Sequence, residues 1–355
     1  MRFLSLLAGL GLVACSPGGS AATPAPEAAD TPQEAVAASP PSERRAFRDW
    51  IAVCDNGNAC FAYGRGEDGI RWIRVAMAAG ADARPEVAAG RWPDDGAENG
   101  PFILTIDATD YPMTLTDNAD VATLSPSRAL EAVRALADGA TARIGSDQAI
   151  SLSGAAAALL WIDERQGRVG TVTALRGPGR QPAAAVPEAP ALPIVTPAPA
   201  VAQTGFGDSE RALPAELEAV PAVAACRAET GDHRAAHQVM SARLDAATEL
   251  WAVPCFVGAY NIGHDWYVTG PGGRDPRPAR LSSSSGEVTA GTINGAYSPE
   301  SRTLSAFAKG RGVGDCGVSS TWTWTGRAFV LTSESEMSEC WGIPAEWWPT
   351  IWRTR

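Results

Sequence analysis

The sequence contains a single lysine, Lys309, and only 3 histidines among its 355 residues. So few histidines, with no paired C-x-x-C knuckles, argue against a zinc site, because such sites use histidine and closely spaced cysteine. The serine nucleophile motif G-x-S-x-G is also absent, which argues against that class of hydrolase. We therefore expect no metal and no cofactor, and the sequence identifies no catalytic residue.

Long apolar runs are missing too: no segment after the N-terminus reaches the roughly 18 consecutive apolar residues of a transmembrane helix. The N-terminus, MRFLSLLAGLGLVACS, combines Arg2 with a short apolar run and small residues before Cys15. This pattern is typical of a bacterial export signal over residues 1–14, and the four residues ending at Cys15 resemble a lipobox. We expect cleavage before Cys15 and lipidation of its thiol, with ordinary signal cleavage nearby as the alternative. The predicted location is a lipid-anchored one, facing the periplasm or at the outer membrane.

Positive charge is scarce, so the net charge is −11 and the sequence pI is about 4.9. An acidic chain is repelled by phosphate backbones and by anionic membrane surfaces, which argues against nucleic acid as a partner. The partners that remain are the membrane, through the lipid anchor, and an envelope protein or a glycan.

Cysteine, by contrast, is well represented. With Cys15 assigned to the anchor, six of the 7 cysteines remain, and an even number in an exported chain predicts three disulfides. We predict the pairs Cys54 with Cys60, Cys226 with Cys255, and Cys316 with Cys340. Each pair closes a local hairpin, and the expected domain boundary isolates the first pair from the other four cysteines.

In the segment CDNGNAC, residues 54–60, the spacing of the two cysteines determines the length of the hairpin loop between them. A two-residue turn would place the two sulfurs on opposite faces of the ribbon. A three-residue loop over residues 56–58 instead makes Cys54 and Cys60 direct partners, with Cα atoms about 4.5 Å apart. The other face of this hairpin is then expected to be the buried one, with Ile51, Val53, Phe61 and Tyr63. A metal or redox role for the two cysteines is the alternative.

Two proline-rich stretches divide the chain. Residues 15–43 are small and acidic and predict a disordered tether. Residues 177–205 alternate proline with alanine and predict a semi-stiff spacer that holds two domains apart. The domain between them, residues 44–176, combines helix and strand patterns, whereas residues 206–355 are rich in strand patterns. The predicted fold class is therefore α+β.

Local signals define several elements of the first domain. Alternation of apolar and polar residues predicts strands at GIRWIRVAM, FILTIDA and ARIGS. Ser125 and Pro126 are suited to the start of a helix that stops at Gly139. A second helix is expected from residue 154 to residue 166, with Ser153 as its cap.

The second domain reads mainly as β-strands, after a short helical stretch near residues 209–220. Gly326-Arg327 suits a two-residue turn that pairs Trp324 with Phe329 and Trp322 with Leu331. We interpret the tryptophans near the C-terminus as core residues, and an exposed aromatic platform for a glycan or protein partner is the alternative.

Few side chains stand out as chemical candidates. Lys309 and Arg311 border a glycine-rich turn whose G-x-G-x-x-G spacing precedes a strand pattern and not a helix, which argues against a nucleotide site. These two cations could instead bind a small anion beside a backbone nest. His264 and Asp265, expected in a loop, could support acid–base chemistry.

Other polar groups are expected to be exposed. His233 and His237 have the i,i+4 spacing of a zinc pair but lack a suitable third ligand. Glu334 and its acidic neighbours alternate with small residues, which is typical of the solvated side of a strand.

Five motifs together resemble the exported bacterial family called domain of unknown function 1176. They are DW-x3-CDN-x3-C-x-A-x-G at residues 49–64, SLSG-AAAALLWIDERQGR-x-GTVTAL at 151–175, VPC-x2-GAYN at 253–261, LSAFAKGRG-x-GDCG at 304–317, and a terminal WWPTIWRTR. The likeness covers nearly all of residues 44–355, and the first half is also similar, more faintly, to the invasion-associated locus B family. The resemblance implies an envelope or secreted protein and carries no catalytic residues with it.

The sequence favours a lipid-anchored, non-enzymatic envelope protein that binds a protein or a cell-wall component. The alternative is an envelope hydrolase or other enzyme with a site in the second domain near His264, Asp265 and Arg311.

Overall fold

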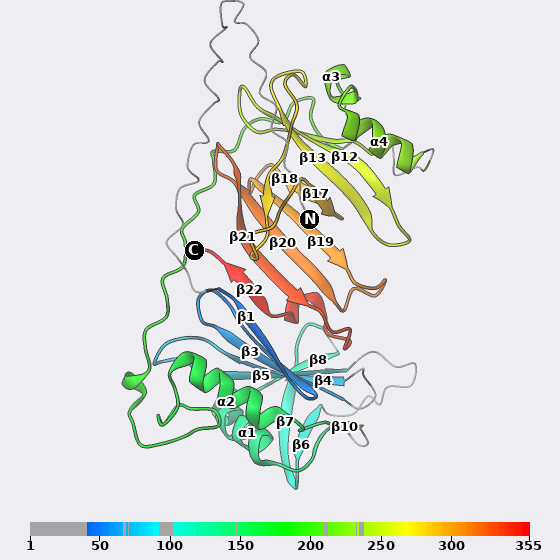
Figure 1. The fold of residues 1–355 in the computed structure, drawn as a ribbon. Coiled ribbons are helices and arrows are strands. Elements are labelled where there is room, and N and C mark those ends of the chain that lie inside the picture. The colour runs from blue at the N-terminus through cyan, green and yellow to red at the C-terminus, as the bar shows by residue number, and fades with distance from the viewer. Residues whose placement is uncertain are drawn as a thin grey trace, which may run out of the picture. The chain divides into compact units, whose positions relative to one another are not determined.

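The computed structural model describes residues 41–355, except residues 67–68, 70, 92–101, 119, 146–147, 209–211, 232 and 234–237. The predicted signal peptide, Cys15, nearly all of the tether and His237 lie outside the described residues. The described residues form one compact unit. Within the described part the chain is mainly β, with 22 strands and four α-helices, which fits the predicted α+β class only broadly (Figure 1). Among these residues no helix is long and apolar enough to cross a membrane.

The first half contains a ten-stranded sheet of antiparallel pairs in the order β1-β2-β3-β4-β5-β8-β7-β6-β9-β10. An isolated bridge between Gly66 and Ile150 brings the end of β10 back to the end of β3, so the sheet curls on itself. Its strands are β1 (Glu43–Phe47), β2 (Trp50–Cys54), β3 (Cys60–Arg65), β4 (Arg71–Met77), β5 (Pro85–Arg91), β6 (Ile103–Ile106), β7 (Thr109–Leu115), β8 (Val121–Leu124), β9 (Ala142–Ile144) and β10 (Gln148–Ile150).

Two helices cover one face of this sheet. Helix α1 (Pro126–Asp138) has the predicted limits, Ser125 before it and Gly139 after it. Helix α2 (Ala155–Gln166) is capped by Gly154 and not, as predicted, by Ser153. Glycine is required at this cap because its φ is 107° and an added Cβ would lie 1.7 Å from the carbonyl oxygen of Phe47.

Both faces of the central strands are buried, which corrects the expectation of a single buried face. Cys54, Cys60, Trp50 and their neighbours belong to the core beneath the helices. Residues on the other face of the same strands, including Ile51 and Tyr63, pack in a second cluster against residues from the C-terminus of the chain. The alternation pattern could not reveal this, because a strand buried on both faces has no polar side.

The second half has two larger sheets, ordered β11-β12-β13-β14, with β17 also paired to β13, and β18-β19-β20-β21-β22. Residues of both sheets share one apolar core, which includes Trp266, Trp322 and Trp324. The strands are β11 (Met240–Arg243), β12 (Glu249–Val257), β13 (Ile262–Thr269), β14 (Arg277–Pro278), β15 (Leu281–Ser282), β16 (Val288–Thr289), β17 (Gly291–Ile293), β18 (Ala296–Ser298), β19 (Thr303–Lys309), β20 (Gly317–Trp324), β21 (Phe329–Met337) and β22 (Thr350–Arg353).

The predicted aromatic ladder is confirmed. Trp324 pairs with Phe329 and Trp322 with Leu331, across a turn closed by Thr325 and Ala328. All four ladder residues belong to the core of the second half. These aromatic residues therefore stabilise the fold, and they do not form an exposed platform.

Two short helices, α3 (Ala215–Glu218) and α4 (Pro221–Thr230), lie on the outer side of β12 and β13. The predicted helical stretch near residues 209–220 therefore begins later and continues further, and part of it lies outside the described residues. Cys226 is on α4, which the sequence analysis did not assign to a helix.

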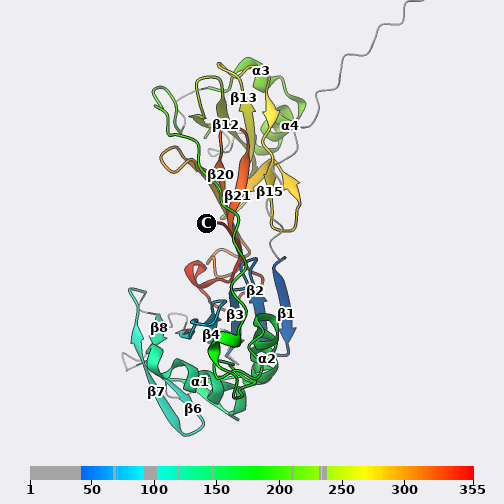
Figure 2. The same ribbon diagram turned by 90° about the vertical axis from the view of Figure 1, so that its left-hand side faces the viewer.

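The composition of the proline-rich segment predicted that it holds the two halves apart, but in the structure it does not. Met337, Ile343 and Trp348 pack with Tyr63 and Trp72 in one apolar cluster shared by both halves. The segment itself is fixed by hydrogen bonds to the second half, from the Arg355 amide to the Pro193 carbonyl and from the Ala198 amide to the Trp324 carbonyl. It runs along the molecule as an extended strap (Figure 2).

Candidate junction site

The CDNGNAC hairpin forms the three-residue loop that its spacing predicts. Cys54 and Cys60 are direct cross-strand partners and are joined by a disulfide, with Cα atoms 4.0 Å apart. The Asp55 carboxylate accepts hydrogen bonds from the amides of Gly57 and Ala59, each 2.8 Å long. The loop residue Asn58 has φ 61°, in the left-handed region that asparagine tolerates.

This loop holds the last strand of the chain. The Asn56 side chain donates to the Arg353 carbonyl and accepts from the Arg353 amide, both at 2.9 Å. The Arg353 guanidinium also donates to the buried Asp55 carboxylate. The Asn56 amide thus binds a free backbone edge of β22 as a neighbouring strand would. The disulfide therefore stabilises a loop that binds Arg353, almost 300 positions further along the chain. We call this set of contacts between Asp55, Asn56 and Arg353 the clamp.

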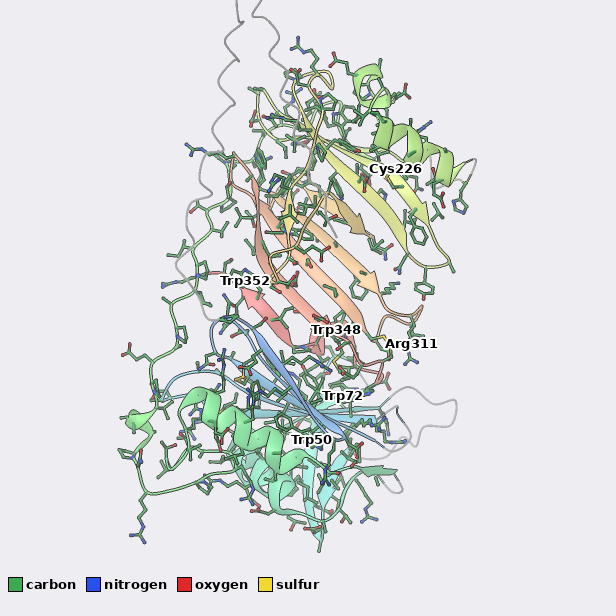
Figure 3. The ribbon with its side chains drawn as sticks, viewed as in Figure 1. Trp50, Trp72, Cys226, Arg311, Trp348 and Trp352 are labelled. Carbon is green, nitrogen blue, oxygen red and sulfur yellow. A yellow bond between two sulfur atoms is a disulfide. The ribbon has the colours of Figure 1, made fainter. Side chains whose placement is uncertain are left out.

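Aromatic side chains complete the contact between the halves. The Trp72 indole donates to the Gly342 carbonyl at 3.2 Å, and the Tyr63 hydroxyl donates to the Trp347 carbonyl at 2.7 Å. The Trp72 and Trp347 rings lie 6.3 Å apart. Figure 3 shows Trp72 and Trp348 where the two halves meet. We call the apolar residues that pack together here, among them Tyr63, Trp72 and Trp348, the junction cluster. Burial raises the pKa of Tyr63 to about 12, so its hydroxyl stays a donor.

A cavity of about 390 Å³ opens beside the junction cluster. The first half contributes residues from the end of β5 and from the turn before β8, and the second half contributes the β19–β20 turn and the segment after Cys340. The lining residues are Arg91, Asn118, Asp120, Phe307, Lys309, Val313, Gly314, Asp315, Gly342, Pro344, Ala345 and Glu346. We call this cavity the junction pocket.

The two predicted anion-binding cations have different roles. Arg311 forms an ion pair with Asp315, with Nε 2.6 Å from Oδ1, and donates to the Cys340 carbonyl. Burial alone would raise the pKa of Asp315, but hydrogen bonds from Arg311 and from the Gly342 amide lower it below its ordinary value. Arg311 is therefore a structural residue, which corrects its assignment to an anion site. Lys309 alone of the pair lines the pocket.

The disulfides agree with the predicted pairing. Cys316 is bonded to Cys340, directly beside Asp315, and Cys226 is bonded to Cys255. Within the described part of the chain, the groups of His, Cys, Asp and Glu close enough to hold a metal each contain one of these cystine pairs. A cystine sulfur has no thiolate to offer, so these groups fit a metal poorly.

The predicted acid–base pair is not assembled. His264 and Asp265 lie on strand β13 and not in a loop, so their side chains point to opposite faces of the sheet. His264 is buried beside Trp266, with rings 6.4 Å apart, whereas a carboxylate oxygen of Asp265 lies 3.8 Å from the Cys226 sulfur beneath α4. Figure 3 shows Cys226 and Arg311 in separate parts of the second half. The structure thus does not bring His264, Asp265 and Arg311 into one site.

His264 predicts a pH dependence of stability. Burial, partly offset by Asp208, lowers its pKa from 6.5 to about 4, and its Nδ1 has no hydrogen-bond partner among the described residues. Between pH 6.5 and 4 the unfolded chain binds the proton and the folded chain does not. This group's contribution, up to about 3 kcal/mol, is therefore present above pH 6.5 and lost as the pH falls to 4.

Denaturant unfolding of the protein and of His264→Gln at several pH values will measure this dependence. We expect the difference in unfolding free energy between the two to shrink as the pH falls from 7 to 4. A difference that stays constant over this range would contradict a neutral buried imidazole.

The family model for a protein of unknown function, DUF1176, matches residues 44–355. The chain belongs to the DUF1176 family. The uncharacterized protein YpfG of Escherichia coli K12 is 32% identical to it over 336 residues, which cover 88% of this chain and 93% of YpfG. No solved structure matches the chain. The likeness to the invasion-associated locus B family stays a prediction.

The motifs that carried the family resemblance are structural ones here. The CDN loop and the terminal WRTR form the clamp. The GDCG segment contains Asp315, which is paired with Arg311, and Cys316, which is bonded to Cys340. In the 151–175 motif, the buried Asp163 carboxylate accepts the amides of Leu175, Arg176 and Gly177 at 2.7–2.9 Å.

Sequence reasoning missed several charged groups that the fold buries, both inside and outside these motifs. Arg168 is fully buried, and its guanidinium donates to the Ala78 and Gly80 carbonyls at 3.0 and 2.7 Å. Glu334, expected on a solvated face, is 5% exposed and accepts hydrogen bonds from Ser284 and Ser320. The signal for Asp163 was present, since a carboxylate inside the run AAAALLWIDE must be either paired or exposed.

Proposed function

We propose that this chain is a lipid-anchored envelope protein that binds an envelope component, protein or cell-wall material, in the junction pocket. The observation that supports this most is the position of Lys309. The only lysine of the chain lines the pocket and makes no ion pair with another described residue. A half-buried cation without an ion-pair partner is costly unless a ligand or solvent compensates it.

The pocket has the features of a ligand site. Its volume lies in the range of small-molecule pockets, which often form where two structural units meet. Phe307, Val313, Pro344 and Ala345 supply apolar wall, while Asn118 and the charged residues supply polar groups. The Cys316–Cys340 disulfide and the hydrogen bond from the Gly342 amide to Asp315 hold one wall of the cavity, so that wall needs little ordering when a ligand binds.

Binding is a better proposal than catalysis for this chain. The enzymatic alternative required His264, Asp265 and Arg311 in one place, and these residues occupy two faces of β13 and a structural ion pair. Among the described residues that line the junction pocket there is no histidine, serine or cysteine. Its chemistry suits recognition by charge and shape.

The anchor and the envelope location are supported by the sequence alone. Arg2, the apolar run and the small residues before Cys15 form the expected lipoprotein signal. Three disulfides in the folded part are suited to an oxidising compartment such as the periplasm.

Photo-crosslinking in living cells will test this function. A benzophenone amino acid at position 313, where the wild-type valine is 57% exposed at the pocket, should yield a discrete adduct that mass spectrometry can identify. The matched control is the same substitution at Val172, which is 49% exposed in the first half, away from the pocket. Metabolic labelling with a fatty acid should mark the wild-type protein but not a Cys15→Ser variant, which should accumulate as an uncleaved precursor or as a soluble periplasmic form.

Identical adduct patterns at positions 313 and 172, or none at either, would contradict binding in the junction pocket. Fatty-acid labelling of the Cys15→Ser protein would contradict the anchor.

A further inference from the structure

The junction pocket has charges of both signs in its wall. Lys309, at the end of β19, is cationic, while Asp120, before β8, and Glu346, after Cys340, are anionic. None of the three forms an ion pair within the described part of the chain. Arg91 also lines the cavity, and its guanidinium lies 5.5 Å from the Phe102 ring.

Charged groups of both signs remain in the lining after its ion pair is set aside. Asp315 is neutralised by Arg311, which leaves Lys309 as a cationic group and Asp120 and Glu346 as anionic groups. A ligand with a single negative charge would be attracted by Lys309 but repelled by the two carboxylates. A ligand with a single positive charge would be attracted by the carboxylates but repelled by Lys309. Only a ligand with separated charges of both signs gains at each end.

Two contacts hold these charges in place. The Asn118 side chain donates to the Glu346 carboxylate at 3.3 Å, and its carbonyl oxygen accepts the Asp120 amide at 3.1 Å. Asn118 thus joins the two acidic residues across the boundary between the halves. The Lys309 ammonium lies 6.0 Å from the centre of the Phe307 ring, and its backbone carbonyl accepts from Asn261.

We infer that the junction pocket binds a short zwitterionic peptide, with its carboxylate at Lys309 and its ammonium at Asp120 and Glu346. This inference rests on the proposed function, because it specifies the ligand class of the same pocket. The apolar wall of Val313, Pro344 and Ala345 suits small side chains between the two charged ends. Such a peptide can be free or can be part of the cell wall.

Calorimetric titration of the full-length protein with four peptides will test the ligand class: tri-alanine, its N-acetyl form, its C-terminal amide and the doubly capped form. Tri-alanine should bind most tightly, and each cap should weaken binding at least about tenfold, because each removes a charge-assisted hydrogen bond. Labelling with [¹⁵N]lysine gives a single lysine amide signal, and its shift on titration should locate the peptide at Lys309.

Variants assign each end of the peptide to its pole. Lys309→Met should weaken tri-alanine about tenfold but leave the C-terminal amide unaffected. Asp120→Asn and Glu346→Gln should instead remove the preference for a free over an acetylated N-terminus. Arg327→Met and Glu287→Gln, at exposed hairpin turns, are the matched controls and should change nothing.

Equal affinity for all four peptides, no binding of tri-alanine, or variant effects no larger than those of the controls would overturn the inference. A specific crosslink at position 313 together with no peptide binding would leave the proposed function intact and reject the peptide alone. Peptide-bearing fragments of purified cell wall provide the second arm. Tighter binding of the fragments than of tri-alanine would assign the ligand to the wall, and equal binding would assign it to free peptide.

Discussion

Replacing Trp72 with alanine is expected to destabilise the folded protein by about 3–5 kcal/mol, the usual cost of deleting a buried tryptophan side chain. Trp72 is fully buried, its indole donates to the Gly342 carbonyl, and its ring packs against Trp347 from the other half. The ring also fills the space above Gly90, where an added Cβ would lie 2.3 Å from it. Removing the Trp72 ring therefore leaves an empty space inside the junction cluster and weakens the packing between the halves.

Denaturant unfolding monitored by circular dichroism will measure this loss. We expect a single unfolding transition for the wild type, because the halves share the junction cluster, and we expect it to separate into two in Trp72→Ala, where the contacts that join the halves are lost. Trp72→Phe keeps a ring without the hydrogen bond and should cost less, and Val172→Ala, at an exposed site, should cost almost nothing. A change below about 1 kcal/mol in Trp72→Ala, with one transition preserved, would mean that the junction cluster does not couple the halves.

Replacing Asp163 with alanine is expected to destabilise the protein by a similar amount, about 3–5 kcal/mol. The carboxylate accepts three successive backbone amides from residues 175–177, where the chain leaves the first half. An alanine leaves these donors buried or half-buried without an acceptor. The adjacent Arg168 would also lose the nearby negative charge that offsets the effect of burial on its pKa.

Thermal and denaturant unfolding of Asp163→Ala and Glu164→Ala form a matched comparison, because the two acidic residues are neighbours on α2 and Glu164 is exposed. Glu164→Ala should lie within about 0.5 kcal/mol of the wild type. Asp163→Asn, which keeps one acceptor oxygen, should fall between the two. Equal stability of the Asp163 and Glu164 variants would show that the amides find other partners.

The two variants are expected to affect the junction pocket differently. Asp163 does not line the pocket, so binding of the proposed peptide should survive its loss in any fraction that remains folded, whereas Trp72 donates to the carbonyl of Gly342 in the pocket wall. The strap over residues 177–205 begins at the Asp163 site and continues to the Pro193 and Ala198 contacts. Loss of Asp163 should therefore expose the strap to proteases sooner than loss of Trp72 does.

The local features of the fold followed from the sequence. The parity of the CDNGNAC loop determined that Cys54 and Cys60 face each other, because only an odd loop places both on one face. The turn at Gly326 determined the register of the Trp322 and Trp324 ladder, and proline and glycine fixed both ends of α1. Each of these depends on residues a few positions apart, where backbone geometry leaves few choices.

Only the tertiary structure determined which residues far apart in the chain contact each other. Composition made the 177–205 segment a spacer, whereas hydrogen bonds from Ala198 and Arg355 make it a docked strap. Lys309 and Arg311 are equivalent in the sequence, yet the fold gives Arg311 a buried carboxylate and leaves Lys309 at the pocket. The pocket joins the turns around Asp120 and Lys309, which are almost 200 residues apart. No local pattern encodes such a pairing, because it arises from the packing of two complete halves at the junction cluster.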